Sequence, residues 1–309
     1  MFSKATHKPK IKRKFFGREG ADKIAGIFFF IPFGVLFLLF TVVPVITAIV
    51  LSFTNYTVLQ EPIIVWFKNF VYLFTEDDTF ILALRQTLTF ALFSGPIGYI
   101  VSFMVAWAID TLKFKKFYAL AFYAPSITSG IAMSVIWLFF FAPDRLGLIN
   151  NLLLDMGVIS DPILWTQNPE WVLFLVVFVS VWMGMGNGFL GFLAGFQNMD
   201  REVFEAGSID GVTNKFQELI YLVLPMMKPM LLFGAVNTIA GSFGIYDIPL
   251  TLVGFPGPDN SALTLVGHLN DFAFNRMDFG YACTIAVIMF AMTFLLGRVV
   301  FKLLDSKDE

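Results

Sequence analysis

The sequence predicts an all-helical integral membrane protein with six transmembrane helices and both termini in the cytoplasm. The 309 residues are 57% hydrophobic and only 14% charged, whereas a soluble domain carries about 25% charged residues. Six apolar segments are long enough to cross a bilayer as helices, which takes about 20 residues each. The basic residues also gather in alternate connections between these segments, as the positive-inside rule requires.

The six predicted spans follow from length and apolar composition. Backbone that faces lipid must bond to itself, so each span is expected to be a helix. The first span follows a basic stretch and is too long for the apolar core of a cleavable signal peptide. No ionisable residue lies near the centre of a span, which argues against a proton-coupled carrier. The predicted spans are 25–52, 87–109, 117–142, 171–195, 229–250 and 279–303.

The distribution of Lys and Arg sets the orientation of the chain. Of the 21 basic residues, all but Lys68, Arg85, Arg145 and Arg276 fall in the N-terminal tail, in two connections, or at the C-terminal end. The two connections join the second span to the third and the fourth to the fifth, and we expect all these parts in the cytoplasm. The basic N-terminal tail could bind nucleic acid, but contact with anionic lipid is the simpler interpretation. We therefore expect membrane lipid, and no nucleic acid, as its partner.

Few residues are available for metal, disulfide or nucleotide chemistry. Cys283 is the single cysteine, so a disulfide within the chain is excluded. His7 and His268 lie far apart in the sequence, which disfavours a Cys/His metal cluster. The sequence has no Gly-rich Lys-Ser/Thr phosphate loop, so we do not expect it to bind ATP itself. No catalytic constellation is visible, and we expect neither an enzyme nor a bound cofactor.

A charged segment interrupts the apolar pattern between the fourth and fifth spans. Asp200 is placed to cap a helix over 201–209, and Gly211 suits the left-handed residue that ends such a helix. Asn214 is placed to cap a second helix, which Pro225 limits. The segment is therefore predicted to form a helix, a tight turn and a second helix.

This predicted hairpin is too short to be stable on helix propensity alone. Phe204, Ile209 and the region of Val212 would give it one apolar face, so something must pack against it. The residues alone leave two alternatives open. The hairpin is either an ordinary connector that rests on lipid headgroups or a docking element for a cytoplasmic partner.

The same segment resembles the EAA loop of ABC importer permeases. The matching residues are Glu205-Ala206-Gly207, then Gly211 after three residues, and later Leu224-Pro225. Gly207 replaces the usual second alanine, and the Leu-Pro pair arrives one residue later than in the family pattern. The blocks YAPSITSGIAMSVIW, GLINNLL, GFPGPDNSALTL and FGYACTIAVIMF resemble the same family in the same order. The likeness covers most of residues 25–305 and is to carbohydrate-type, binding-protein-dependent permeases, similar to the maltose-transporter F and glycerol-phosphate-transporter A subunits.

The resemblance implies a type I ABC importer permease fold in a bacterial cell membrane and a role in ATP-driven uptake of a sugar or oligosaccharide. It implies four partners: a second, different permease that completes the pore, two ATP-binding cassette ATPase subunits and an extracytoplasmic solute-binding protein. Glu205 would pair with a basic residue of an ATPase, and small Ala206 and Gly207 would allow close approach. Gly211 would make the turn, and Asp210 would belong to the same docking segment.

Small and polar residues fall on one helical face in each of two spans. Close packing of helices through small residues is the alternative explanation, and for the glycines it is the simpler one. For the asparagines a functional role is favoured, because a carboxamide within a span needs a partner and a sugar hydroxyl would supply it. The resemblance places the substrate path at Ser180, Gly184, Asn187, Asn237 and Gly241, and Gly188 and Gly244 complete the two faces.

The expected organisation is a basic cytoplasmic tail at 1–23, a six-helix permease domain at 24–305 with a coupling loop at 198–228, and a short tail at 306–309. Two alternatives to sugar import stay open. One is the same role for another solute, such as glycerol phosphate. The other is a secondary transporter or channel, which predicts charges within spans or inverted internal repeats, and neither is visible.

Overall fold

The computed structural model describes the backbone of residues 18–305 and, apart from residues 18–25, 27, 187 and 303–305, their side chains. The chain divides into two compact units, residues 1–50 and 51–309. Most of the predicted basic tail, residues 1–17, and the predicted tail 306–309 lie outside the described residues.

The first unit holds one long helical segment made of α1 (Arg18–Phe37), the π-helical turn η2 (Leu38–Val42) and the greater part of α2 (Val43–Ser52). In the turn, the N–H of Val43 donates to the carbonyl of Leu38, five residues earlier. Pro44 follows directly, and a proline ring clashes with the carbonyl four residues before it. A wider π turn at this place accommodates the ring. The side chains of Phe29 and Phe40 are exposed, as expected for a helix that faces lipid.

Four helices of the described chain are long and apolar enough to cross a membrane, and six spans result if each of two bent helix pairs counts as one. These four helices correspond to the first, second, fourth and sixth predicted spans, with bounds that differ by up to nine residues at an end. They are Phe28–Ser52, Asp78–Asp110, Pro169–Gln197 and Phe279–Lys302.

The third predicted span, 117–142, is not one straight helix. It is replaced by α5 (Lys115–Ile127) and α6 (Gly130–Phe140), whose axes meet at 97°. The helix breaks because Thr128 is extended, with φ −82° and ψ 146°, and Ser129 is also non-helical. A continuous helix at this place was therefore the wrong expectation.

The helix of the fifth predicted span, 229–250, ends earlier than expected at its C-terminal end. At its N-terminal end it is joined to the preceding helical segment through a bend. α12 (Lys228–Phe243) ends at Gly244, because the following backbone leaves the helical region before α13 (Asp247–Val253) begins. At its start, α12 bends by 78° from the preceding helical segment Lys215–Met226. Pro225 and Pro229 flank this bend, and neither can donate the backbone hydrogen bond that a straight helix would need.

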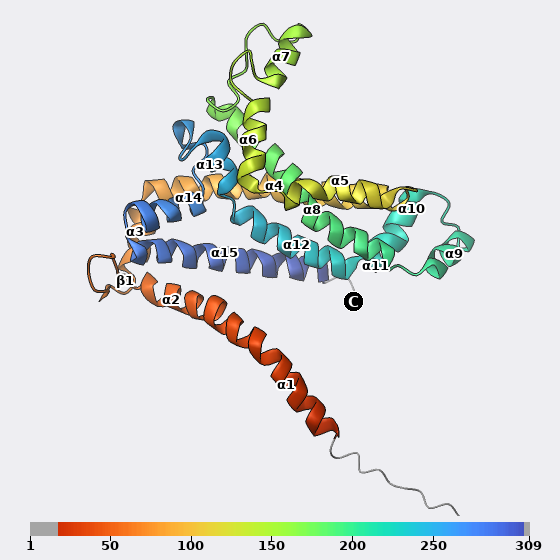
Figure 1. Ribbon diagram of the computed structural model, residues 1–309, viewed down its shortest axis with the longest axis horizontal. Helices are drawn as coiled ribbons and strands as arrows, with labels where there is room; N and C mark the ends of the chain where they lie inside the picture. Colours follow the sequence, from red (N-terminus) through yellow and green to blue (C-terminus); the bar gives the residue numbers. More distant parts are fainter. Residues whose placement is uncertain (1–17, 306–309) are drawn as a thin grey trace, which may run out of the picture. The chain divides into compact units, whose positions relative to one another are not determined.

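The long helices of the second unit pack against one another (Figure 1). α4 (Asp78–Asp110) packs on α8 (Pro169–Gln197) and α12, α5 packs on α8, and α12 packs on α15 (Phe279–Asp305). Several helices approach each other through glycines. A Cβ on Gly234 would lie 2.8 Å from Cζ of Phe192, and a Cβ on Gly195 would lie 2.8 Å from Cε of Met227. These glycines allow close packing of α12 on α8.

Short elements fill the connections of the second unit. α9 (Arg201–Ile209), α10 (Lys215–Glu218), η3 (Leu219–Val223) and α11 (Leu224–Met226) lie together at one end of the bundle, and α3 and α14 lie at the opposite end (Figure 1). The first set, residues 201–226, is called the α9 hairpin below. The remaining elements are β1 (Thr54–Asn55), β2 (Ile63–Ile64), α3 (Lys68–Thr75), α7 (Leu148–Asp155), η4 (Pro258–Asn260), α14 (Leu265–Asn270) and η5 (Asp271–Asn275). β1 and β2 pair antiparallel, with Thr54 opposite Ile64.

Candidate functional site

The first helix of the α9 hairpin forms as its sequence predicts. The side chain of Asp200 accepts a hydrogen bond from the N–H of Glu202 at 3.0 Å and so caps the helix. At the other end Gly211 has φ +99°, and the N–H of Val212 donates to the carbonyl of Gly207 at 3.0 Å. This 6→1 bond is the signature of a glycine-terminated helix, so the turn depends on a residue without a side chain.

The second helix of the hairpin contains a π turn that accounts for the late Leu-Pro pair. Asn214 caps the helix by accepting from the N–H of Gln217 at 2.8 Å. Further on, the N–H of Leu224 donates to the carbonyl of Leu219, five residues earlier. A π turn holds one residue more than an α turn, so the extra residue of this sequence is absorbed directly before Pro225. The faces of the helix on either side therefore stay aligned.

Within that turn, Leu219 and Val223 are buried in the bundle, and Leu222 faces α9. Ile220 and Tyr221 are exposed, whereas Leu222 packs against Gly207 of α9. A Cβ on Gly207 would lie 2.7 Å from Cδ1 of Leu222. The small size of Gly207 thus serves packing inside the hairpin, and Gly207 itself is buried.

The other predicted docking residues face away from the bundle. Glu205, Ala206, Asp210 and Gly211 are all exposed. In the part of the chain that the structure describes, the carboxylate of Glu205 makes neither a hydrogen bond nor an ion pair. A negative side chain without a partner is thus presented on a short helix whose ends are fixed by caps.

The predicted apolar face of the hairpin is divided between two sides. Phe204 packs on the buried cluster around Phe103 and Phe189, but Ile209 is 86% exposed. The expectation that Phe204 and Ile209 share one face was wrong, because five residues on a helix turn the side chain by more than a quarter of a circle. Ile209 instead shares the outward face with Glu205, four residues before it. Nothing in the sequence pattern singles Ile209 out for docking.

A cavity of about 750 Å³ lies among α4, α8 and α12, with the start of α13 at its edge. Four of the five predicted substrate-path residues line it, namely Ser180, Gly184, Asn237 and Gly241. Gly188 and Gly244 line it as well, whereas the side chain of Asn187 lies outside the described residues. The structure therefore brings the faces predicted on two separate spans to one cavity.

The glycines of these faces differ in what surrounds them. A Cβ on Gly188 would lie 3.6 Å from Cβ of Ser102, which is ordinary contact between helices. A Cβ on Gly184 or Gly241 would meet no atom within 4 Å. Helix packing thus explains Gly188, but it does not explain Gly184 and Gly241, which leave the cavity open.

Two polar groups of the cavity have unused hydrogen-bonding capacity. The hydroxyl oxygen of Ser180 is buried and has no hydrogen-bond partner within the described chain. Asn237 donates from Nδ2 to the carbonyl of Phe233 at 3.1 Å, which leaves its second N–H and its Oδ1 without a partner among the described residues. The exposed carboxamide of Asn237 can bind a hydroxyl of a solute, whereas the hydroxyl oxygen of Ser180 has no accessible surface in this structure.

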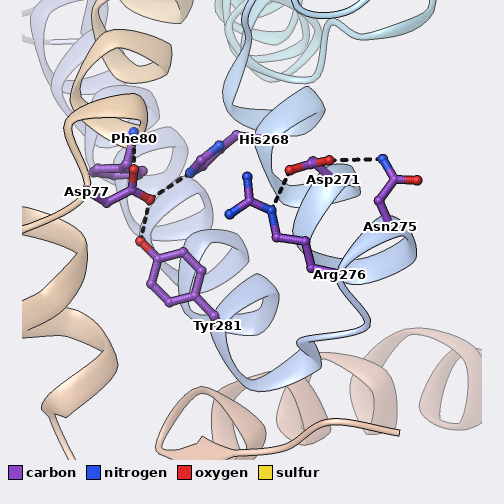
Figure 2. Close-up of polar contacts among 7 residues, drawn as sticks. All are labelled: Asp77, Phe80, His268, Asp271, Asn275, Arg276 and Tyr281. Atoms are coloured by element: carbon purple, nitrogen blue, oxygen red, sulfur yellow. Dashed lines mark hydrogen bonds and ion pairs between the residues drawn. The ribbon is translucent and has the colours of Figure 1, made fainter.

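A buried polar cluster that the sequence pattern does not indicate lies at the end of the bundle opposite the α9 hairpin (Figure 1), and Figure 2 shows its contacts. Oδ2 of Asp77 accepts from the hydroxyl of Tyr281 at 2.6 Å and lies 2.8 Å from Nε2 of His268. Oδ1 of Asp77 accepts from the N–H of Phe80 at 2.9 Å and so caps α4. Asp77, His268 and Tyr281 are each less than a tenth exposed. These three residues, called the Asp77 cluster below, join α4, α14 and α15.

The electrostatics of this cluster hold Asp77 ionised. Burial raises the pKa of its carboxyl, but the hydrogen bonds from Tyr281, His268 and the N–H of Phe80 together lower that pKa below its ordinary value. An ionised carboxylate only accepts hydrogen bonds, so Nε2 of His268 must be the protonated nitrogen. Next to the cluster, Arg276 binds Asp271 at 2.8 Å and lies 4.1 Å above the ring of Phe272.

Comparison with known proteins finds relatives among ABC transporter permeases. No family model matches the chain. The chain is 33% identical over 298 residues to the probable ABC transporter permease protein YesP of Bacillus subtilis (strain 168), and the match covers 93% of this chain and 94% of that protein. It is 30% identical over 290 residues to the arabinooligosaccharides transport system permease protein AraP of the same organism, with 93% and 90% covered.

The fold is also similar to a solved structure. A chain in the crystal structure of a bacterial ABC transporter involved in the import of the acidic polysaccharide alginate superposes with a TM-score of 0.79 at 19% identity. The match covers 96% of this chain and 100% of that chain. At this identity the likeness shows that the two chains share a fold.

Proposed function

The chain belongs to the carbohydrate-type permeases of binding-protein-dependent ABC importers, and we propose that it forms half of the translocation pore for a sugar or oligosaccharide. As a permease subunit of an ATP-driven importer it is a multi-pass membrane protein. We place it in a bacterial cell membrane, with six spans and both termini in the cytoplasm. The basic tail 1–23, the permease domain 24–305 and the coupling loop 198–228 are proposed as its parts.

The outward face of α9 is the observation that carries this proposal. Glu205, Ala206 and Ile209 lie on it together, and the Glu205 carboxylate is exposed. A guanidinium group of another chain can bind such a carboxylate through two parallel hydrogen bonds. Ile209, whose side chain is 86% exposed, would add an apolar contact beside that carboxylate in the proposed interface.

We therefore assign the α9 hairpin to docking on an ATP-binding cassette ATPase. Glu205, Ala206 and Ile209 would contact the ATPase. Gly211 and Asp210 would fix the turn beside the contact, and Gly207 would hold α9 against the second helix. Hydrolysis of ATP belongs to the two ATPase subunits, and this chain would transmit their motion to the spans.

The cavity supports assignment of the solute path to α8 and α12. Asn237 and the open surface at Gly184 and Gly241 would face the solute, and Ser180 would lie beside them in the cavity wall. A saccharide hydroxyl matches the unused capacity of Asn237. A second, different permease would supply the other half of the pore. An extracytoplasmic solute-binding protein would deliver the solute.

A charge reversal at Glu205 tests the docking role. The chain would be co-expressed with the proteins encoded beside it, and uptake and ATP hydrolysis would be measured in proteoliposomes. Glu205→Lys should lower uptake at least tenfold, because it places a positive charge against a basic group of the ATPase. The variant should keep the thermal stability of the wild-type permease. Asp155→Lys, an exposed reversal at the end of α7, is the matched control and should transport normally.

Two results would contradict the proposal. Uptake at the wild-type level in Glu205→Lys would remove the docking role of α9. Purification of the chain without any ATPase or second permease, after co-expression with its neighbours, would remove the importer assignment itself.

A further inference from the structure

The polar side chains that line the cavity are hydroxyl and carboxamide groups, with one exception. Within the described chain, the lining contains no Lys, Arg or His, and its one carboxylate is that of Asp247. The cavity walls therefore offer no positive charge to a solute. They carry one negative charge, at the edge where α13 begins.

The directions of the hydrogen bonds leave the cavity with more free acceptors than free donors. The hydroxyl of Thr238 donates to the carbonyl of Gly234 at 2.8 Å, and the hydroxyl of Ser242 donates to the carbonyl of Thr238 at 2.8 Å. A hydroxyl group has one proton, so each of these oxygens has only lone pairs left. The same holds for Ser102, whose hydroxyl donates to the carbonyl of Met185 at 3.2 Å.

The unused capacity of the cavity is thus mainly that of acceptors. Acceptors bind the O–H groups of a solute, whereas a carboxylate or phosphate brings acceptors of its own. The donors left for such a group are few: the second N–H of Asn237 and the hydroxyl of Tyr246 have no partner among the described residues, and the hydroxyl of Ser180 is buried in the wall.

Asp247 adds charge to this bias. It is the first residue of α13, is exposed and lines the cavity. A cleft lined by one sign of charge with apolar walls repels ions of the same sign more than an open surface does. Its carboxylate also accepts hydrogen bonds from solute hydroxyls.

We propose that this cavity admits uncharged, hydroxyl-rich solutes and disfavours anionic ones, and that Asp247 is a residue that determines this selectivity. The inference rests on the proposed function, because it concerns the solute that passes through the pore. It selects a neutral saccharide over a phosphate-bearing solute such as glycerol phosphate. An anionic solute would lose its hydration without gaining donors or a positive charge from the described walls.

Thiol labelling inside the cavity tests this without knowledge of the natural solute. Gly241→Cys places a thiol in open space, because a Cβ there meets no atom within 4 Å. The background carries Cys283→Ala, which removes the single native cysteine. The probes are three methanethiosulfonate reagents of similar size that carry a sulfonate, a hydroxyl or a trimethylammonium group. They are applied to the complete importer, with its second permease and ATPases.

The measured quantity is the labelling rate of the anionic reagent divided by that of the neutral one. This ratio cancels any change in the reactivity of the thiol itself. With Asp247 in place, the ratio should be about five- to tenfold lower than for a small free thiol. Asp247→Asn should remove most of that difference, and Asp247→Lys should raise the ratio above the value for a free thiol. The ratio for the cationic reagent should change in the opposite direction. Asp155→Asn removes a carboxylate away from the cavity and should leave the ratio unchanged.

An unchanged ratio in both Asp247 variants overturns this inference. So does a ratio that Asp155→Asn shifts as much as Asp247→Asn does, since the effect would then be that of net charge. Failure of the proposed function has a different signature. It appears as an importer that assembles without ATPases or takes up no saccharide, whatever the labelling ratio.

Discussion

The Asp77 cluster and the α9 hairpin place the same kind of residue, a carboxylate in a short connection, in opposite situations. Asp77 is buried and accepts three hydrogen bonds, all from its own chain. Glu205 is exposed and, among the described residues, has no partner for its side chain. A carboxylate that the chain satisfies internally holds elements together, whereas one that the chain leaves unsatisfied on a rigid helix is available to another protein.

The backbone around the two carboxylates shows the same contrast. The Asp77 cluster joins α4, α14 and α15, and its outermost members, Asp77 and Tyr281, lie 204 residues apart in the sequence. The caps and turn of the α9 hairpin are local, as at Asp200 and Gly211, and its inner face is held on the bundle by apolar side chains such as Phe204 and Leu219. We therefore expect substitutions in the cluster to change stability and substitutions on the outward face of the hairpin to change assembly.

The largest effect on stability is expected for Asp77→Asn. The substitution removes a charge that binds Tyr281 and His268 and leaves buried polar groups imperfectly paired. Hydrogen bonds to charged groups contribute about 1.5–3 kcal/mol, so the free energy of unfolding should fall by about 2–3 kcal/mol. Glu205→Gln, a matched loss of charge on the hairpin, should change it by less than about 0.5 kcal/mol.

Denaturant titration of the purified protein in detergent, followed by tryptophan fluorescence, measures both values. Equal destabilisation by the two variants would break the comparison. It would show that the carboxylate of Glu205 has an internal role as well.

The second-largest effect on the free energy of unfolding is expected at acidic pH, where Asp77 becomes protonated. The pKa of Asp77 is lowered from 3.8 in the folded protein, so its ionised form contributes stability fully above pH 3.8. This contribution is lost as the pH falls through the lowered folded value. The stability difference between the wild type and Asp77→Asn should therefore be constant from pH 7 to about pH 5 and shrink below about pH 4. A difference that already vanishes between pH 7 and pH 5 would contradict the lowered pKa.

A smaller effect is expected for Gly207→Ala, which restores the alanine of the family pattern. The new methyl group would meet Cδ1 of Leu222, but the end of a leucine side chain can move. Crowding should therefore cost about 1 kcal/mol or less. In Leu222→Ala, which empties that space, the same substitution should cost nothing or stabilise the helix. A penalty that is the same in both backgrounds would show that Gly207 does not pack on Leu222.

The smallest effect on stability is expected for Ile209→Asp. Its side chain is 86% exposed, so the free energy of unfolding should change by less than about 0.5 kcal/mol. Its effect on assembly should be large, because an apolar anchor of an interface is replaced by a charge. The dissociation constant for the ATPase should rise at least tenfold, as measured by binding of purified ATPase to permease in nanodiscs. Normal binding would remove Ile209 from the interface.

The two regions also differ in how far the sequence alone predicts them. Asp200, Gly211 and Asn214 act as predicted, because helix caps and left-handed turns depend on neighbours in the sequence. The π turn before Pro225 explains the late Leu-Pro pair, but its place could not be predicted from a residue count. The Asp77 cluster was missed because Asp77 lies about 190 residues before His268, and nothing in the local pattern shows that they meet.

Span prediction shows the same limit. Long apolar helices such as Asp78–Asp110 follow from composition, whereas the break at Thr128–Ser129 depends on local backbone geometry that composition does not record. The cavity could be predicted in part from the sequence. Helical periodicity placed Ser180 with Gly184, and Asn237 with Gly241, but only packing of α12 on α8 brings the two faces together.

Site-directed crosslinking tests the central claim, that the outward face of α9 docks on an ATPase. Ala206→Cys and Phe204→Cys, each in the Cys283→Ala background, would be treated with a short photoactivatable thiol crosslinker in the assembled importer. Ala206 faces outward, and Phe204 packs on the bundle. The structure predicts a product with the ATPase subunit from position 206 and little from position 204. Equal products from both positions, or none from position 206, would contradict the claim.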